Sequence, residues 1–346
     1  MRNQIYKQEW RDIIIMNKKV IVFGGGTGMS YLLRGLKQYP LDITAIVSVC
    51  DDGGSTGKLR DEFDILAIGD IRKVIESLSD NENEISNLLN YRFESNGELN
   101  NHSLGNLIIL AEMKLHGSVQ KAIETLSQIL KLKGKVLPFT EDKVTLIGEM
   151  EDGTIIEGEH YITESPKKIK KVYYKEEPTI SEELINEIKT ADLILLSMGS
   201  LYTSVIPNLL SKDIKNAIDE SQGKLVYCCN LFTQPGETDD FKVSDHVKTL
   251  NSYLGTKKIE YVIANNEKID NELIQKYATL EQKDLVLLDK KETENLGTKV
   301  ISDELAYIKN KDGEFENVYR HNYVKLGFLI NTIALDYAYM LRKKNK

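Results

Sequence analysis

Val20-Ile21-Val22-Phe23-Gly24-Gly25-Gly26-Thr27-Gly28 is the stretch that decides the fold, because a short apolar run passes directly into a glycine-rich loop. A helical pattern of leucines follows, and Pro40 closes it. A second apolar run at residues 43–49 then leads into another glycine-containing loop at 50–57. Strand, loop, helix and strand in this order indicate the opening of a parallel βαβ sheet whose strands are buried on both faces.

The same rhythm continues along the chain, with further strands expected at residues 193–196, 225–229, 259–264 and 285–288 and a closing helix at 324–341. We therefore predict an α/β fold built on a Rossmann-like, doubly wound, mainly parallel sheet. Between about 135 and 174 the pattern alternates around Asp152-Gly153, a hairpin signal that predicts a small antiparallel β-hairpin insertion. The expected organisation is a single α/β domain over residues 16–346, after an N-terminal extension at 1–15.

Composition narrows the classes of function. Of the 346 residues, 41% are hydrophobic and 28% are charged, which is typical of a globular protein with a large core. The net charge of -8 disfavours nucleic acid as a partner, and the lysine cluster at 167–171 is interpreted as a solvated strand edge. No apolar run is long enough to span a membrane. The three cysteines, Cys50, Cys228 and Cys229, form no disulfide or zinc pattern, so we expect a cytoplasmic protein.

The loop Gly24-Gly25-Gly26-Thr27-Gly28 is the sharpest single motif. Glycines let backbone N–H groups approach phosphate oxygens, and the helix that follows presents its positive end. The loop lacks the Lys-Ser/Thr pair of a P-loop, and the third glycine of a dinucleotide-binding pattern would fall on Met29 or Tyr31. We predict a phosphate-binding loop, and the alternative is an ordinary tight turn between strand and helix.

The second loop, Asp51-Asp52-Gly53-Gly54-Ser55, has two functional interpretations. An acidic residue at the end of a strand can bind a ribose hydroxyl. Alternatively, Asp51 or Asp52 could hold Mg²⁺ beside a bound phosphate. The structural alternative is an Asx turn that caps the next helix.

Polar clusters also follow the later strands, and polar residues from several parallel strands are expected to meet at one edge of the sheet. Asp70 and Arg72 are candidates for phosphate contacts or for an ion-pair network within the protein. In the segment around His102, Ser103 is either a ligand contact or an N-cap. The full set of these candidates is Asp70, Arg72, His102, Ser103, Asn106, Gly199, Ser200, Tyr202, Thr203, Ser204, Asn230, Thr233, Gln234 and Gly236.

Taken together, these loops resemble the CofD-like family, and specifically its gluconeogenesis-factor branch. The matching segments lie in order along most of the chain. They are Gly-Gly-Gly-Thr-Gly-Met-Ser at 24–30, Asp-Asp-Gly-Gly-Ser-Thr-Gly at 51–57, Gly-Asp-Ile-Arg at 69–72, His-Ser-Leu-Gly-Asn at 102–106, Gly-Ser-Leu-Tyr-Thr-Ser at 199–204, and residues 230–238. The chain departs from the family pattern at Ser197-Met198, where the branch usually has Gly-Pro, and at Ile68, where it usually has Pro.

The resemblance implies two contrasting functions. CofD enzymes are Mg²⁺-dependent 2-phospho-lactate transferases that act on a guanosine-diphosphate donor and a deazaflavin. The gluconeogenesis-factor branch is expected instead to bind UDP-N-acetylglucosamine, without a settled catalytic activity, and to support cell shape and wall synthesis on gluconeogenic carbon. Tyr277 and Arg320 of this chain resemble the tyrosine and arginine that are tied to UDP-sugar binding in that branch. Related proteins also suggest a homodimer.

Overall fold

The centre of the protein is a seven-stranded sheet in which every strand pair is parallel. The computed structural model describes residues 17–267, 279, 283–311 and 314–335, so the expected extension at 1–15 lies outside the described residues. The strands of this sheet are β1 (Lys18–Gly24), β2 (Leu41–Val47), β3 (Lys135–Pro138), β7 (Leu193–Leu196), β8 (Lys224–Cys228), β9 (Tyr261–Asn265) and β10 (Lys299–Asp303).

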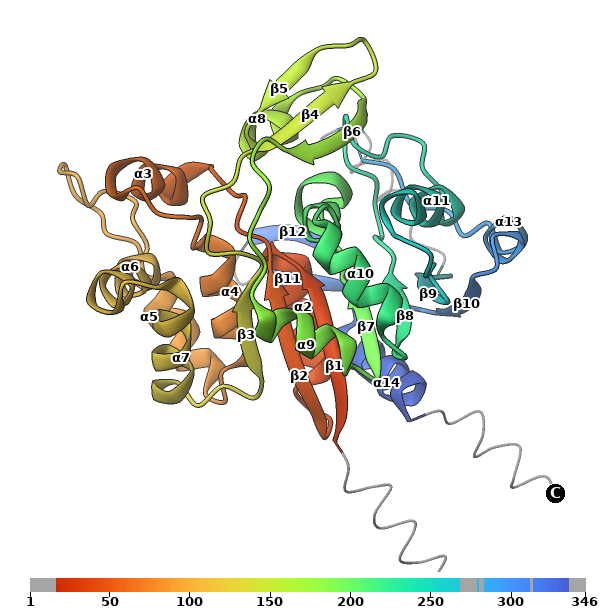
Figure 1. Cartoon of the computed structure of the whole chain (residues 1–346), viewed down its shortest axis with the longest axis horizontal. Coiled ribbons are helices and arrows are strands. Elements are labelled where there is room, and N and C mark those ends of the chain that lie inside the picture. The colour runs from red at the N-terminus through yellow and green to blue at the C-terminus, as the bar shows by residue number, and fades with distance from the viewer. Residues whose placement is uncertain (1–16, 268–278, 280–282, 312–313, 336–346) are drawn as a thin grey trace, which may run out of the picture.

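The strand order is β10-β9-β8-β7-β1-β2-β3, and this order creates a switch point between β1 and β7. The chain builds outward from β1 to β3, returns to the centre, and then builds outward on the other side from β7 to β10 (Figure 1). The loops that leave β1 and β7 therefore diverge to opposite faces and leave a crevice between them. The predicted Rossmann-like, doubly wound fold is confirmed.

Helices cover both faces of the sheet. In Figure 1, α9 (Glu182–Lys189) and α10 (Lys212–Glu220) cover the near face, while α2 (Gly26–Leu36), α4 (Gly69–Leu78) and α14 (Tyr323–Ala334) cover the far face. On the far face α2 packs against both α4 and α14. Other helices flank the two ends of the sheet: α3 (Gly54–Phe63), α5 (Glu82–Asn90), α6 (Leu104–His116) and α7 (Val119–Ile129) on the β3 side, and α11 (Val243–Tyr253) and α13 (Lys290–Asn295) on the β10 side.

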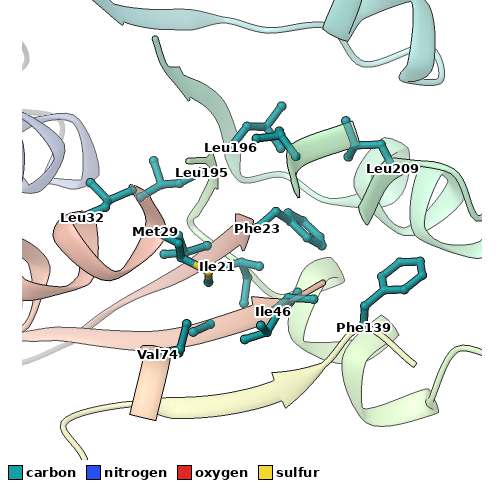
Figure 2. Packing of buried hydrophobic residues seen from close by; sticks show 14 of the residues in the cluster. Ile21, Phe23, Met29, Leu32, Ile46, Val74, Phe139, Leu195, Leu196 and Leu209 are labelled. Carbon is teal, nitrogen blue, oxygen red and sulfur yellow. The ribbon is translucent and has the colours of Figure 1, made fainter. Parts of the chain in front are cut away.

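The core forms on both faces of the central strands, which explains their continuous apolar sequence. Figure 2 shows Leu195 with Leu32 on the α2 side of the sheet, and Phe23 and Leu196 with Leu209 on the opposite side. All five side chains are buried. Full burial of such a side chain contributes about 1.5–3 kcal/mol, so the central strands anchor the loops that follow them.

A three-stranded antiparallel sheet lies beyond the carboxyl ends of the main strands (Figure 1). It consists of β4 (Leu146–Met150), β5 (Ile155–Glu157) and β6 (Ile169–Tyr174), with the short helix α8 (Glu159–Glu164) between β5 and β6. This insertion begins later than the expected residue 135, because Lys135–Pro138 pairs in parallel with β2 as the edge strand of the main sheet. On β6, Lys170 and Lys171 are exposed and both pair with Glu149, in keeping with a solvated strand edge.

The carboxyl-terminal part differs from expectation in two places. The prediction of a strand at 285–288 is wrong. This segment makes only an isolated bridge to Phe232, and the Val286 N–H donates to the Leu231 carbonyl. The seventh strand is instead β10, which is only half-buried and therefore lacks an apolar run. A hairpin of β11 (Ala306–Lys311) and β12 (Glu314–His321), which the sequence pattern did not indicate, precedes α14. Among the helices of the described ranges, none combines the length and apolar character that crossing a membrane requires.

The surroundings of Gly28 show how closely α2 approaches the loop after β7. A Cβ atom added at Gly28 would lie 2.0 Å from the Met198 carbonyl oxygen, so only glycine fits the first turn of this helix without a shift of the backbone. Helix propensity alone would make Ala better than Gly by about 1 kcal/mol.

We predict that Gly28→Ala lowers the free energy of unfolding by roughly 1–3 kcal/mol, because the overpacking outweighs the propensity gain. Urea denaturation measures the change. Gly97→Ala is the matched control, since a Cβ atom at Gly97 would meet nothing within 4 Å. Equal or greater stability of Gly28→Ala would show that α2 does not approach the β7 loop this closely.

Candidate functional site

The first loop of the site leads from β1 into α2. Gly25 is the N-cap of α2, and among the residues that the structure describes no side chain accepts a capping hydrogen bond at this end of the helix. The first turn also contains no acidic residue. The N–H groups of a first turn have no partner within the helix, and the helix dipole makes this end positive, so the loop can receive an anion.

The second loop follows β7 and is held in place by the side chain of Asn230, at the end of β8. The Gly199 N–H donates to Asn230 Oδ1 at 3.0 Å, and Asn230 Nδ2 donates to the Gly199 carbonyl at 2.6 Å. Ser200 then caps the helical turn Leu201–Val205 by accepting from the Thr203 N–H at 3.0 Å. These two hydrogen bonds, which we call the Asn230 clamp, therefore tie the loop after β7 to the loop after the neighbouring strand β8.

A cavity of about 370 Å³, which we call the main cavity, lies between these two loops. The loop after β8 and the end of β12 complete its wall. The lining residues are Thr27, Gly28, Tyr31, Met198, Gly199, Ser200, Asn230, Leu231, Phe232, Thr233, Gln234, Lys283, Tyr319, Arg320 and His321. Its volume falls within the ~300–1,000 Å³ typical of small-molecule sites, and its wall combines main-chain groups, aromatic rings and two cations.

Glu237 lies behind the main cavity and fixes the Ser200 side chain. Ser200 Oγ donates to this carboxylate, at 2.8 Å from Oε1 and 2.7 Å from Oε2, and Gln234 Nε2 donates to Oε1 at 2.6 Å. Burial raises the pKa of Glu237 to about 7, although the hydrogen bonds from Ser200 and the Tyr202 N–H lower it. Glu237 was not among the residues expected at the site, because a lone glutamate in a polar loop gives no sign of its burial.

Glu159 of α8 connects the antiparallel insertion to the same loop. Thr163 Oγ1 donates to Glu159 at 3.0 Å, and its hydroxyl lies 3.3 Å from that of Thr203. Burial raises the pKa of Glu159 to about 7, and the charge of Asp51 raises it further. Glu159 and Glu237, each with a pKa of about 7, thus lie next to the loop that begins at Ser200.

The carboxylate that lies against the first loop is Asp70 of α4, whose Oδ2 would be 2.5 Å from a Cβ atom at Gly25, and neither it nor Asp51 and Asp52 after β2 lines the main cavity. Asp51 accepts from the Gly53 N–H at 3.0 Å, which is the Asx turn considered above, and Asp52 accepts from the His160 N–H at 2.7 Å. Burial, followed by the charge of Asp70, raises the pKa of Asp51. In the described ranges, no group of three or more His, Cys, Asp or Glu residues is placed to hold a metal ion.

The residues around Arg72 form a network within the protein. Arg72 is buried, and it donates from Nε to Asn106 Oδ1 at 3.1 Å and from Nη1 to the Asn90 side chain. Ser103 is the N-cap of α6, where it accepts from the Asn106 N–H, and His102 is buried beside it. Ser103 and Asn106 therefore take structural positions that support Arg72.

The other expected residues divide between the main cavity and its surroundings. The main cavity brings together Thr27, Gly28, Gly199, Ser200, Asn230, Thr233, Gln234 and Arg320. Tyr202, Thr203 and Ser204 lie behind its wall, and Gly236 accepts from the Ile169 N–H and so packs on β6. Tyr277 lies outside the described residues. Phe232 and Tyr319, whose rings tilt toward each other 6.3 Å apart, were not expected at the site.

Comparisons with known proteins agree with this fold. The family model described as 2-phospho-L-lactate transferase CofD matches residues 20–306. The chain is 43% identical over 313 residues to the gluconeogenesis factor of Bacillus subtilis, covering 90% of this chain and 96% of the relative. It is 43% identical over 310 residues to the gluconeogenesis factor of Halalkalibacterium halodurans, covering 89% of this chain and 94% of the relative. A crystal structure of a Bacillus halodurans protein matches with a TM-score of 0.86 and 41% identity, over 91% of this chain and 100% of that one. The chain therefore belongs to the CofD family and, within it, to the gluconeogenesis-factor branch.

Proposed function

We propose that this protein binds a nucleotide sugar of the UDP-N-acetylglucosamine type in the main cavity. The observation that carries the proposal is the position of this cavity at the switch point, where the uncapped end of α2 faces the loop after β7. Such a position is where open α/β sheets hold their ligands. The wall also carries Lys283 and Arg320, cations that suit a diphosphate.

The hydrogen bonds of the site suggest which part of the main cavity binds the diphosphate and which part binds the base. The Gly199 N–H already donates to Asn230, so we assign the diphosphate to the first-turn N–H groups of α2 and to Arg320, an exposed side chain. We assign the base to the side where Phe232 and Tyr319 present aromatic faces, because stacking on such rings stabilises a base by about 1–3 kcal/mol. Gly199 and Asn230 then shape the wall of the cavity.

We further propose that the protein acts in the cytoplasm as a homodimer that supports cell shape and wall synthesis on gluconeogenic carbon sources. The support is indirect: close relatives are named gluconeogenesis factor, and the three cysteines are buried and unpaired. On this proposal the bound nucleotide sugar is a signal, and ligand binding stabilises the folded protein by mass action.

A second candidate function is phosphotransfer, which the family model's own description suggests. The observation in its favour is the crowding of Asp51 and Asp70, which raises the pKa of Asp51. A Mg²⁺ ion that kept several waters and bound one or two of these carboxylates together with ligand phosphates would relieve this repulsion. The transfer itself would then need positioning and charge neutralisation rather than a covalent nucleophile.

Arg320→Gln tests the assignment of the main cavity. Isothermal titration calorimetry with UDP-N-acetylglucosamine should show binding to the wild type and an affinity about tenfold or more lower for Arg320→Gln, because a charge-assisted hydrogen bond is lost. Arg92→Gln is the control, since Arg92 is also exposed and donates to a carbonyl but lines no part of the main cavity. Absence of binding by the folded wild type at millimolar ligand would reject the proposal.

Glu237 should make stability depend on pH. Its folded-state pKa of about 7 lies above its ordinary value of 4.5, so the unfolded state loses its proton first as pH rises. The contribution of Glu237 to stability is therefore present below pH 4.5 and declines by about 3 kcal/mol as pH passes 7. Urea denaturation between pH 4.5 and pH 8 should show the wild type losing stability relative to Glu237→Gln by roughly this amount. A difference that stays constant across this range would contradict the burial cost assigned to Glu237.

Asp51→Asn separates the two candidate functions. If the protein is a phosphotransferase, Mg²⁺-dependent turnover of a nucleoside-diphosphate donor should be measurable, and Asp51→Asn should abolish it. If it is a binding protein, Asp51→Asn should leave the affinity for UDP-N-acetylglucosamine within about threefold of wild type, because Asp51 lies outside the main cavity. Phosphorus NMR detects the turnover, and calorimetry measures the affinity.

A further inference from the structure

His321 is the last residue of β12 (Glu314–His321) and lines the main cavity with a half-buried side chain. We propose that His321 selects the base of the bound nucleotide, because its Nδ1 atom accepts a hydrogen bond from a ring N–H such as the N3–H of uracil. This inference rests on the proposed function, since it concerns the nucleotide in the main cavity. It goes further by naming a residue that distinguishes one base from another, which stacking on aromatic rings does not do.

A main-chain carbonyl group decides which ring nitrogen of His321 carries the hydrogen. Nε2 lies 3.0 Å from the carbonyl oxygen of Cys229, the residue that follows β8. A carbonyl oxygen can only accept a hydrogen bond, so the hydrogen is on Nε2. Cys229 is itself held by the sheet, because its N–H donates to the Ile263 carbonyl at 2.9 Å. In the neutral ring, Nδ1 is therefore an acceptor at a position that the sheet fixes.

The imidazole ring of His321 is neutral at physiological pH. Burial lowers the pKa of His321 to about 4, the hydrogen bond to the Cys229 carbonyl opposes this decrease, and the charge of Arg320 adds to it. A proton on Nδ1 would turn the acceptor into a donor, and the low pKa prevents this at neutral pH. Among the residues that the structure describes, no hydrogen bond engages Nδ1. The atom is thus available to a ligand.

His321 lies beside the aromatic rings to which the base is assigned. β11 and β12 pair in regular register from Ala306 opposite His321 to Ile308 opposite Tyr319. Alternate residues of a strand share a face, so the side chains of Tyr319 and His321 project from the same face of the hairpin, about 7 Å apart. The Phe232 ring lies 6.3 Å from that of Tyr319. A base stacked on these rings can therefore turn the edge that carries its ring N–H toward His321.

Neighbouring polar groups of the wall do not supply the same function. Both amide atoms of Asn230 are engaged with Gly199, whose N–H donates to Oδ1 and whose carbonyl accepts from Nδ2. Lys283 and Arg320 can only donate hydrogen bonds, so they suit phosphate oxygens rather than an N–H group. His321 adds a neutral acceptor to the same wall. The wall therefore combines donors for a diphosphate with an acceptor for a base that carries a ring N–H.

This acceptor distinguishes uracil from cytosine. Uracil carries a hydrogen on N3, whereas N3 of cytosine carries none and is itself an acceptor. Cytosine in the same place would set two acceptors against each other and leave both without a hydrogen bond. A site built to receive an N–H rejects an analogue that lacks it. We therefore expect the wild type to bind UDP about tenfold or more tightly than CDP, which differs from UDP only in the base.

Calorimetry with UDP and CDP tests the selection, and His321→Phe is the variant, because phenylalanine keeps an aromatic ring and has no acceptor. The preference for UDP over CDP should fall to about threefold or less in His321→Phe. The ratio of the two affinities is the informative quantity, since a structural role of His321 would weaken the binding of both ligands alike. His116→Phe is the matched control and should keep the wild-type ratio, because His116 is exposed at the end of α6 and lines no part of the main cavity. Thermal unfolding shows whether each variant is folded.

Nitrogen NMR of the histidine side chains tests the same claim in the wild type, whether or not His321→Phe folds. The free protein at neutral pH should show His321 with its hydrogen on Nε2, and saturating UDP should shift the Nδ1 resonance. His321→Gln, whose amide can still donate to the Cys229 carbonyl, identifies the His321 resonances by their loss. His246 is an internal reference with the opposite tautomer, because its Nδ1 lies 3.0 Å from the Lys242 carbonyl oxygen. It lines no part of the main cavity, so its resonances should stay in place.

Four results would overturn the inference: a hydrogen on Nδ1 of His321 in the free protein, an Nδ1 resonance that UDP leaves unchanged, equal binding of UDP and CDP by the wild type, or a folded His321→Phe that keeps the wild-type preference. Each of these results, with UDP-N-acetylglucosamine still bound by the wild type, leaves the proposed function standing. Failure of the folded wild type to bind UDP-N-acetylglucosamine rejects the proposed function and this inference together, whatever the tautomer of His321.

Discussion

The close approach of two main chains at the switch point is the constraint on which the rest of the structure depends. β1 pairs in parallel with β7, so the loops that leave them start side by side and separate only after the first turn of α2 has passed Met198. A side chain at Gly28 would block this approach. The Asn230 clamp then holds the second loop by its main chain. The main cavity exists because these backbone contacts keep both loops at the same edge of the sheet.

Cationic and acidic side chains occupy different places around this edge of the sheet. The cations Lys283 and Arg320 lie on the main cavity wall, whereas the carboxylates Asp51 and Asp70 line no part of it. Glu159 and Glu237 sit between the antiparallel insertion and the loop after β7, joined through the hydroxyl groups of threonines and Ser200. Their raised pKa values follow from burial, and so the packing of the insertion against the site is linked to protonation.

The order of the central elements and the glycine-rich loops could be predicted from sequence, because buried parallel strands have continuous apolar runs and tight turns require glycine. β10 and the hairpin of β11 and β12 could not, since half-buried strands carry no such run. The site was predictable where it follows a strand end, as at Thr27 and Asn230. It was not predictable where a distant segment folds back, as Tyr319 does, or where only burial gives a residue its role, as with Glu237.

The central claim is that the uncapped end of α2 receives a diphosphate across the crevice from the loop after β7. A crystal structure of the protein with UDP-N-acetylglucosamine tests it most directly. The account predicts that the diphosphate lies within hydrogen-bonding distance of the Thr27 and Gly28 amides and of Arg320, with the base beside Phe232 and Tyr319. A diphosphate bound elsewhere, with the main cavity empty, would contradict the account.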